Sequence, residues 1–211
     1  MTPQAPGLRG LYAITDAALC ARLGLMEAVA RALAGGARIV QYRDKGGDPG
    51  RRLAEAAALA SLCRAAGARF IVNDDVELAL AVDADGVHVG RDDGSLAEAR
   101  ARLGPGRLVG ASCYDRLELA RAAAAAGADY VAFGSFHPSP TKPNAVRADL
   151  GLLRQARLAL RVPLVAIGGI TPENGAPLVA AGADMLAAIG AVFGPSDPRA
   201  AAAAFAALFD H

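Results

Sequence analysis

The sequence has little that would support binding to nucleic acid or insertion into a membrane. Tryptophan is absent, aromatic residues make up 5% of the chain, and the formal net charge is +1 at pH 7. Proteins that bind nucleic acid usually carry a basic patch, and aromatic side chains on which bases stack. No segment is both long enough and apolar enough to cross a bilayer. We therefore expect neither nucleic acid nor a membrane as a partner.

Cysteine is also scarce, and its spacing is uninformative for redox or metal chemistry. Cys20, Cys63 and Cys113 are scattered and form no CxxC pair. Such residues are typical of buried thiols in a reducing compartment. The first ten residues lack the apolar stretch of a signal peptide. We expect a cytoplasmic protein.

Lysine is the rarest cation: Lys45 and Lys142 stand against twenty arginines. Both lie in short polar loops, 41–47 and 136–143, that follow apolar runs. An ammonium group is a compact point charge on a flexible stem, unlike the planar guanidinium, and it commonly binds phosphate. Either lysine alone could be a chance remainder of an arginine-rich composition. The two together indicate a site for phosphate groups or a metal-bound diphosphate.

Short apolar runs alternate with alanine- and arginine-rich stretches that have helical spacing. The expected strands are Leu11–Thr15, Arg38–Arg43, Arg69–Asn73, Gly86–Gly90, Leu108–Cys113, Tyr130–Phe136, Pro163–Gly169 and Met185–Gly190. The expected helices are 18–34, 50–66, 76–82, 95–103, 115–126, 149–160, 173–181 and 197–209. Nearly continuous apolar strands suit a parallel sheet buried on both faces, and strict alternation favours βαβ units.

Eight such units in 211 residues predict a single α/β domain, 1–211, folded as a (β/α)8 TIM barrel. A doubly wound open sheet is the alternative. In a barrel the active site lies at the carboxyl ends of the strands. The residues expected on that rim are Gln41, Arg43, Lys45, Asn73, Asp74, Asp75, Asp92, Asp93, Ser112, Ser139, Thr141, Lys142, Gly168, Gly169 and Gly190.

Two acidic pairs follow neighbouring strands and predict a cation site. Carboxylates such as Asp74 and Asp93 can share one Mg²⁺, which takes oxygen ligands and usually keeps water and substrate phosphate. Helix capping is the alternative for Asn73 and Asp75, because an amphipathic segment begins at Val76. For Asp75 we favour the cap.

Two loops are suited to anions. Gly168 and Gly169 precede Thr171, a candidate N-cap, and Pro172, which fits the first helical position. Glycines there let backbone N–H groups approach a phosphate. In the other loop, the proline-stiffened run 138–143 places Ser139, Thr141 and Lys142 together as an anion clamp. A Schiff-base role for Lys142 is the weaker alternative, because it sits in a polar loop.

The histidines are less informative. His88 lies inside an apolar strand, and we interpret it as structural. His137 flanks the anion loop, and we leave open whether it acts as an acid or base. The sequence shows no Ser/His/Asp order and no cluster of histidines for a metal.

Several blocks together resemble the thiamine phosphate synthase family over nearly the whole chain. They are Leu11–Asp16, Gln41–Gly47, Phe70–Ala79, Gly86–Gly90 with Asp93, Pro138–Pro143 and Ala166–Ile170. The resemblance implies the (β/α)8 barrel fold. It also implies that the protein is a transferase, which moves a pyrimidinylmethyl group. Its substrates would be the diphosphate of 4-amino-5-hydroxymethyl-2-methylpyrimidine and a thiazole phosphate, and its products thiamine phosphate and diphosphate.

By the same resemblance, Asp74 and Asp93 would bind Mg²⁺ as the cofactor. Gln41, Arg43, Lys45 and Asn73 would hold the pyrimidine diphosphate, with Ser112 on the pyrimidine and Lys142 on the diphosphate. Ser139, Thr141, Gly169, Ile189 and Gly190 would bind the thiazole phosphate. Arg43, Lys45, Lys142 and Ser112 are the expected catalytic residues. The chain departs from the family at Gly190, where a serine is common, and at His137, where an aromatic residue is frequent.

The residues agree with this chemistry. Cations and Mg²⁺ can neutralise a departing diphosphate, and a nucleophilic thiazole nitrogen needs no strong general base. A thiazole tautomerase-like isomerase on the same barrel is the nearest alternative, because His137 could shuttle a proton. A non-catalytic phosphate sensor and other phosphate-binding barrels, such as an epimerase or aldolase, stay open. A homo-oligomer also stays open.

Overall fold

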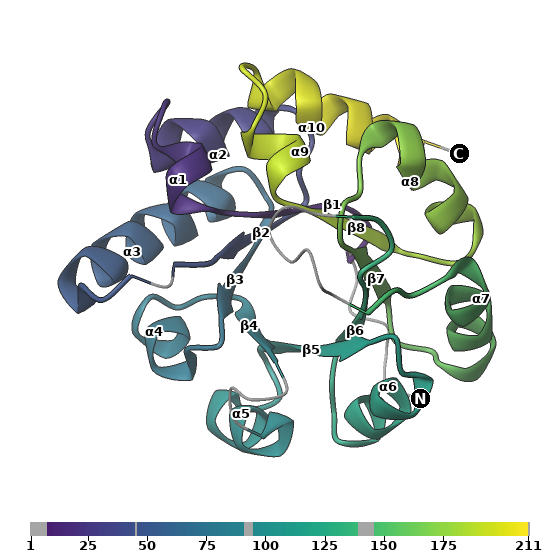
Figure 1. The fold of residues 1–211 in the computed structure, drawn as a ribbon. Coiled ribbons are helices and arrows are strands. Elements are labelled where there is room, and N and C mark those ends of the chain that lie inside the picture. Colours follow the sequence, from purple (N-terminus) through teal and green to yellow (C-terminus); the bar gives the residue numbers. More distant parts are fainter. Residues whose placement is uncertain (1–7, 45, 91–94, 139–145, 211) are drawn as a thin grey trace.

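Parallel strands form a closed barrel at the centre of the protein, and helices surround it (Figure 1). The computed structural model describes residues 8–44, 46–90, 95–138 and 146–210. The strands, hydrogen-bonded in chain order with β8 closing on β1, are β1 (Gly10–Ile14), β2 (Ile39–Tyr42), β3 (Arg69–Asn73), β4 (Gly86–Val89), β5 (Leu108–Tyr114), β6 (Tyr130–Gly134), β7 (Leu164–Ile167) and β8 (Met185–Ala188). The predicted (β/α)8 barrel is confirmed, and the open sheet is excluded.

The helices match the predicted segments with two differences. They are α1 (Ala17–Cys20), α2 (Leu25–Ala34), α3 (Pro49–Ala65), α4 (Val76–Ala81), α5 (Leu96–Leu103), α6 (Leu117–Ala125), α7 (Leu150–Ala159), α8 (Pro172–Ala180), α9 (Gly190–Phe193) and α10 (Pro198–Ala206), with a 3-10 turn, η1 (Ala207–Phe209). The single helix predicted over 18–34 was wrong, because Gly24 has φ 81° and separates α1 from α2. The four-residue helix α9 was missed because it is too short for a periodic signal.

Aspartate side chains begin several of the helices by accepting backbone N–H bonds. Asp48, Asp149 and Asp197 do so for α3, α7 and α10. The predicted cap at Asp75 is confirmed, since its Oδ1 accepts the Leu78 N–H at 2.9 Å. These bonds satisfy donors that have no partner inside the helix. Each cap therefore fixes where the chain leaves the barrel rim and turns into a helix.

Three further aspartates tie the amino ends of the strands together. Asp85, Asp129 and Asp184 each precede a strand and accept a backbone N–H of a neighbouring strand. The bonds are Phe70 N to Asp85 at 2.8 Å, Val109 N to Asp129 at 2.7 Å and Leu164 N to Asp184 at 2.8 Å. Each carboxylate also pairs with an arginine: Arg69, Arg100 and Arg157 respectively. This repeated contact stabilises the end of the barrel away from the predicted site.

The core has two parts because each strand buries both faces. Leu8, Ile39, Ile71, Val165 and Met185 are among the residues that fill the barrel interior. The outward faces of the strands pack under the helices and form the larger cluster. This arrangement explains the nearly continuous apolar strands of the sequence.

The three cysteines are buried free thiols, as predicted. Burial raises the pKa of Cys63 and of Cys113 to about 12, so neither is a ready nucleophile. Within the described part of the chain, no helix is long and apolar enough to cross a membrane.

Candidate active site

The described residues that the sequence assigned to a site lie on one rim of the barrel. All follow the strands or lie in the carboxyl-terminal half of a strand, so they face the same end of the closed parallel barrel. They are Gln41, Arg43, Asn73, Asp74, Asp75, Ser112, Gly168, Gly169, Ile189 and Gly190. The other predicted site residues lie outside the described residues: Lys45, Asp92, Asp93, Ser139, Thr141 and Lys142.

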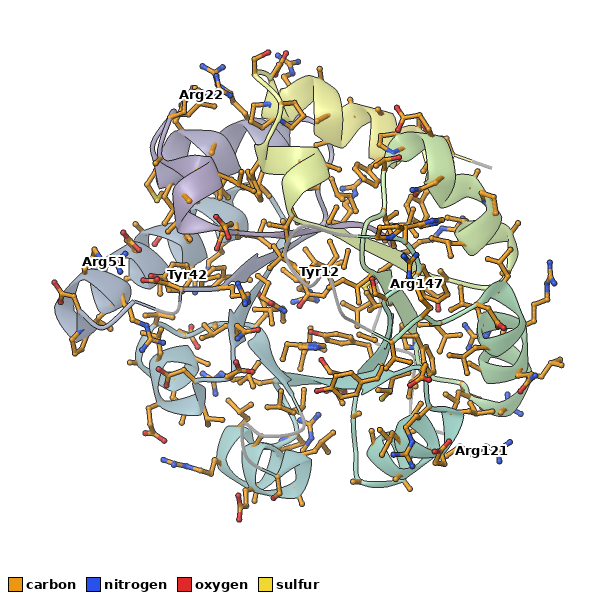
Figure 2. All side chains as sticks on the ribbon, viewed as in Figure 1. Tyr12, Arg22, Tyr42, Arg51, Arg121 and Arg147 are labelled. Carbon is orange, nitrogen blue, oxygen red and sulfur yellow. The ribbon has the colours of Figure 1, made fainter. Side chains whose placement is uncertain are left out.

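Side chains from five strands form a chain of hydrogen bonds across the barrel interior. Gln41 Nε2 donates to the Tyr12 hydroxyl at 2.8 Å, and the Tyr12 and Tyr130 hydroxyls lie 2.9 Å apart. Tyr130 Oη lies 3.3 Å from His88 Nδ1, and His88 Nε2 lies 2.9 Å from Ser112 Oγ. Figure 2 shows Tyr12 at the centre of the barrel. Gln41 and Ser112, which stand at the two ends of this series of hydrogen bonds, are both predicted to bind the pyrimidine substrate.

Tyr12 and Tyr130 were missed by the sequence reading. Both are almost completely buried, at 1% exposure each. Their one signal in the sequence is a hydroxyl inside an otherwise apolar strand, since a buried tyrosine usually finds a hydrogen-bond partner. Burial raises the pKa of both hydroxyls well above the ordinary value. They therefore stay protonated near neutral pH and act as hydrogen-bond donors and acceptors, not as bases.

His88 belongs to this hydrogen-bond network and is also buried in the core. Its ring stacks on Tyr130 with centroids 5.6 Å apart and an interplanar angle of 27°. Its exposure is 8%, which agrees with the structural interpretation. The sequence did not predict its hydrogen bond with Ser112. His88 orients a residue of the candidate site from beneath.

The loop after β2 is held by a small network of charges. Arg51 of α3 pairs with both Asp44 and Glu55, at 2.9 Å for Glu55. Asp44 also accepts the Gly46 N–H at 2.8 Å, and the Tyr42 hydroxyl donates to Glu55 at 2.7 Å. Figure 2 shows Tyr42 and Arg51 along the same side of the barrel. These contacts tie the loop that carries Arg43 and Lys45 to α3.

Ionisation of Asp44 is favoured by this network. Burial alone would raise its pKa, but the Gly46 N–H and the Arg51 guanidinium outweigh burial and hold the pKa below the ordinary value. Asp44 therefore stays charged near neutral pH. On the other side of the loop, the Arg43 N–H donates to Thr15 Oγ1 at 3.0 Å. The loop is thus held at Arg43 by Thr15, which follows β1, and at Asp44 by α3.

Asp74 has an unusual backbone conformation that turns it out of β3. Its φ is 63°, in the left-handed region that few residues other than glycine, asparagine and aspartate adopt. Its N–H donates to His88 O at 2.9 Å, which places it beside β4, and its carboxylate accepts a bond from Asn73 Nδ2. The half-buried carboxylate lies at the rim, and carboxylate oxygens are the type of donor that Mg²⁺ prefers. The described residues thus supply one carboxylate of the predicted pair.

The loops after β6 and β7 are packed so tightly that only glycine fits. Gly168 and Gly169 have φ 105° and 62°. A Cβ at Gly168 would lie 2.1 Å from Ser135 Oγ, and one at Gly169 would lie 2.3 Å from Pro138 O. One bond joins the two loops, from His137 N to Gly168 O at 2.9 Å. A second bond, from Ser135 Oγ to His137 O at 2.8 Å, lies within the loop after β6. The backbone leading into residues 139–142 is therefore fixed against the β7 loop.

The start of α8 packs next to the loops after β6 and β7. Thr171 is the N-cap and Pro172 lies in the first turn, as predicted. Asn174 holds the turn by accepting the Thr171 N–H at 2.8 Å and donating to Gly169 O at 3.0 Å. Asn174 was not singled out from the sequence as a positioning residue.

Gly190 begins α9 at the end of β8, with Ile189 as the N-cap. Gly190 is exposed, and a Cβ placed there would have no heavy atom within 4 Å. The space for a larger residue is therefore present. Nothing in the packing requires glycine at this position.

A barrel with an arginine, carboxylates and glycine-lined loops on its carboxyl-terminal rim has the features of an enzyme that handles phosphorylated small molecules. Comparison with known proteins narrows this class. The family model of thiamine monophosphate synthase matches residues 11–192. The chain belongs to the thiamine monophosphate synthase family, and it is therefore a transferase of thiamine phosphate synthesis.

Similar proteins match this chain along nearly its whole length. The thiamine-phosphate synthase of Thiobacillus denitrificans is 58% identical over 200 residues, covering 95% of this chain and 94% of that protein. That of Chromobacterium violaceum is 59% identical over 205 residues, covering 97% and 98%. The solved structure of thiamine phosphate pyrophosphorylase from Pyrococcus furiosus has a TM-score of 0.87 at 36% identity, covering 97% and 96%.

Proposed function

We propose that the carboxyl-terminal rim joins the pyrimidinylmethyl group of a pyrimidine diphosphate to thiazole phosphate, forming thiamine phosphate and releasing diphosphate. The observation that carries this assignment is the hydrogen-bonded chain from Gln41 to Ser112. It crosses the barrel interior and orients polar groups on two sides of the rim. Family membership supplies the reaction class.

The pyrimidine would bind on the rim side of this hydrogen-bond network. Gln41 and Ser112 offer an amide and a hydroxyl to the ring nitrogens and the amino group of an aminopyrimidine. Both side chains are already engaged from below, by Tyr12 and His88. Their orientation is therefore set before substrate arrives, which lowers the entropy cost of binding.

The diphosphate would lie toward β2 and β3. Arg43 and Lys45 would approach it from one loop, Asn73 from β3, and Lys142 from the loop after β6. Positive charge at these places would stabilise negative charge that develops on the leaving group. The contacts of Thr15, Asp44 and Arg51 with the β2 loop support a fixed position for Arg43.

Asp74 and Asp93 would hold Mg²⁺ beside the diphosphate. The outward turn of Asp74 and its place next to β4 support this role. When bound, the ion would supply further neutralisation of the leaving diphosphate. Asn73, which donates to the Asp74 carboxylate, would orient it.

The thiazole phosphate would bind on the opposite side, between the loops after β6, β7 and β8. Ser139, Thr141, Gly169, Ile189 and Gly190 would surround it. The close packing of Gly168 and Gly169 on the β6 loop brings backbone groups together there. Since the usual serine is a glycine at position 190, this chain would bind the phosphate with one hydroxyl fewer.

The reaction needs charge stabilisation more than proton transfer. Departure of diphosphate leaves a cationic methylene that the electron-rich aminopyrimidine tolerates, and the thiazole nitrogen supplies the electron pair for the new bond. The buried hydroxyls of Tyr12 and Tyr130, with their raised pKa values, offer no base near this nitrogen. The dissociative path accounts for the charged groups on the rim, and it requires no nucleophilic attack by Ser112, although Ser112 Oγ is hydrogen-bonded to His88.

A direct assay tests the proposal. The full chain is mixed with both substrates, with Mg²⁺ or with excess chelator, and thiamine phosphate and diphosphate are measured. We expect equal amounts of the two products, and only with the metal. Isomerisation of a thiazole substrate without release of diphosphate would instead establish the tautomerase alternative.

A further inference from the structure

The amino-terminal end of the barrel, opposite the rim, contains a cavity of about 870 Å³. It lies where β1, β2, β3 and β5 begin and where α3 and α5 end. Its volume falls in the range of small-molecule sites. The charged residues that line it are Arg9, Arg38, Arg64, Arg69, Arg107, Asp83 and Asp85. None of them belongs to the rim described above.

Neighbouring strands place two of the arginines on one edge. The Arg69 N–H donates to Arg38 O at 2.9 Å, and the Arg38 N–H donates to Leu11 O at 3.0 Å. Arg38 Cγ also lies 3.1 Å from the place that a Cβ on Gly10 would take. The absence of a side chain at Gly10 thus leaves room for the Arg38 stem at the start of β1.

The two carboxylates are already engaged. Asp85 accepts Arg69 Nη1 at 2.7 Å and the Phe70 N–H at 2.8 Å. Asp83 accepts Arg107 Nη2 at 2.6 Å and pairs with Arg64 at 3.4 Å. Three of the five guanidinium groups pair with the two carboxylates, and the lining has an excess of positive charge.

Among the residues that the structure describes, two of the arginines have no carboxylate partner. Arg9 donates to Phe209 O at 3.4 Å and lies over the Phe209 ring at 5.6 Å. Among the described residues, Arg38 makes no ion pair and no side-chain hydrogen bond. Both are exposed. Their donors are available to a ligand that enters the cavity.

Some carbonyl groups at the helix ends near the cavity are already hydrogen-bonded within the protein. The carboxyl end of a helix carries partial negative charge on its free carbonyl groups. Here Cys63 O accepts the Ala68 N–H at 2.9 Å, and Arg100 O accepts the Gly104 N–H at 3.0 Å. Arg100 Nη1 also donates to Arg107 O at 2.6 Å. These bonds occupy some of the carbonyl groups at the two helix ends.

We propose that this cavity is a second anion site, which binds a compact anion with two or more phosphoryl groups. Guanidinium groups bind phosphate through paired N–H bonds, and a diphosphate offers enough oxygens to meet several of them. The ligand is either free diphosphate or the diphosphate of a nucleotide. These two share the chemistry that the arginines recognise.

Calorimetric titration of the full chain in EDTA tests the site, with inorganic diphosphate in one arm and ADP in the other. The test variant is Arg9→Gln with Arg38→Gln. The control is Arg121→Gln, which removes the same kind of charge from the outer surface by α6 (Figure 2). We expect the double variant to bind at least about tenfold more weakly, because charge-assisted bonds are lost. The control should match the unsubstituted chain.

A further variant separates this site from the rim. Arg43→Ala should leave binding in the cavity intact, and the double variant should still form thiamine phosphate from its substrates. Tighter binding of ADP than of diphosphate would identify a nucleotide as the ligand, and equal binding would identify the phosphoryl groups alone. Binding that is lost in Arg43→Ala but unchanged in the double variant would refute the second site. So would the absence of binding to the unsubstituted chain. Arg38→Gln alone serves if the double variant fails to fold.

Discussion

The hydroxyl groups of Tyr12 and Tyr130 lie 2.9 Å apart inside the barrel, joining β1 to β6 across its interior. Their rings meet edge to face, with centroids 6.0 Å apart and an interplanar angle of 74°. Through this bond, Gln41 on β2 is connected to His88 on β4 and Ser112 on β5. Two side chains predicted to contact the pyrimidine are thus oriented by one buried network.

Breaking that bond should affect both stability and substrate binding. Tyr130→Phe leaves Tyr12 and His88 each without one partner, and we expect a loss of about 1–3 kcal/mol in the free energy of unfolding. The KM for the pyrimidine diphosphate should rise, because Gln41 and Ser112 are less well oriented. Thermal unfolding and steady-state kinetics measure the two effects. Tyr12→Phe and the double variant complete a double-mutant cycle, and additive effects would show that the hydroxyls are not coupled.

Asp74→Asn should lower kcat by about 10² or more while the fold stays intact. The substitution keeps the size and the tolerance for positive φ but removes the charge that would hold Mg²⁺. Asp75→Asn is the matched control, because asparagine also caps helices and α4 would keep its N-cap. Kinetics over a range of Mg²⁺ concentrations tests the role. Unchanged turnover in Asp74→Asn would exclude Asp74 as a metal ligand.

Gly190→Ser should improve binding of thiazole phosphate. The position has open space and no positive φ, so the serine side chain fits without strain. Its hydroxyl would donate to the phosphate, and we expect KM to fall by about threefold to tenfold. Gly190→Ala adds the Cβ without the hydroxyl and should leave KM unchanged. An equal effect from alanine would attribute the gain to the backbone and not to a hydrogen bond.

Gly169→Ala should disrupt the packed loops after β6 and β7, where we propose that thiazole phosphate binds. The new Cβ would lie 2.3 Å from Pro138 O, and the backbone has φ 62°, so one of the two loops must move. We expect loss of most activity with thiazole phosphate and a lower melting temperature. Gly106→Ala is a control, since a Cβ there meets nothing within 4 Å and the backbone φ is not positive. A Gly169→Ala enzyme with normal kinetics would mean that this loop does not bind the phosphate.

Asp44 should make stability depend on pH in the acid range. Its folded-state pKa is below the ordinary value, because the Gly46 N–H and the Arg51 guanidinium outweigh the effect of burial. The contribution of the charged form is therefore present above the unfolded-state pKa and is lost as the pH falls below 3.8 toward the folded-state value. Chemical unfolding of Asp44→Asn and the unsubstituted chain should differ at pH 7 and converge in acid. A difference independent of pH would show that the charge of Asp44 is not responsible.

Local patterns in the sequence were enough to predict the barrel and the side of it that carries the site. Apolar strands such as β6 and β7 alternate with amphipathic helices, and this alternation permits few topologies. The rule that loops after the strands share one rim then placed Gln41, Asp74 and Gly169 together. Helix caps such as Asp75 and Thr171 were readable because capping depends on neighbours in the chain.

The break at Gly24 and the short helix α9 could not be read in the same way. A glycine inside a helical pattern is tolerated or breaks the helix, depending on how the chain packs on the barrel. In this chain Gly24 has φ 81° and separates two helices. Helix α9 has four residues, fewer than a periodic pattern requires.

The sequence by itself determined the alternation of strands and helices, and with it the barrel and the rim, because hydrophobic spacing and capping act over short stretches of chain. Only the tertiary structure decided that Tyr12, Tyr130 and His88 connect Gln41 to Ser112. It also decided that arginines far apart in the sequence, at the starts of several strands, line one cavity. These contacts join residues far apart in the sequence, and only pairing of the strands in the folded barrel brings them together.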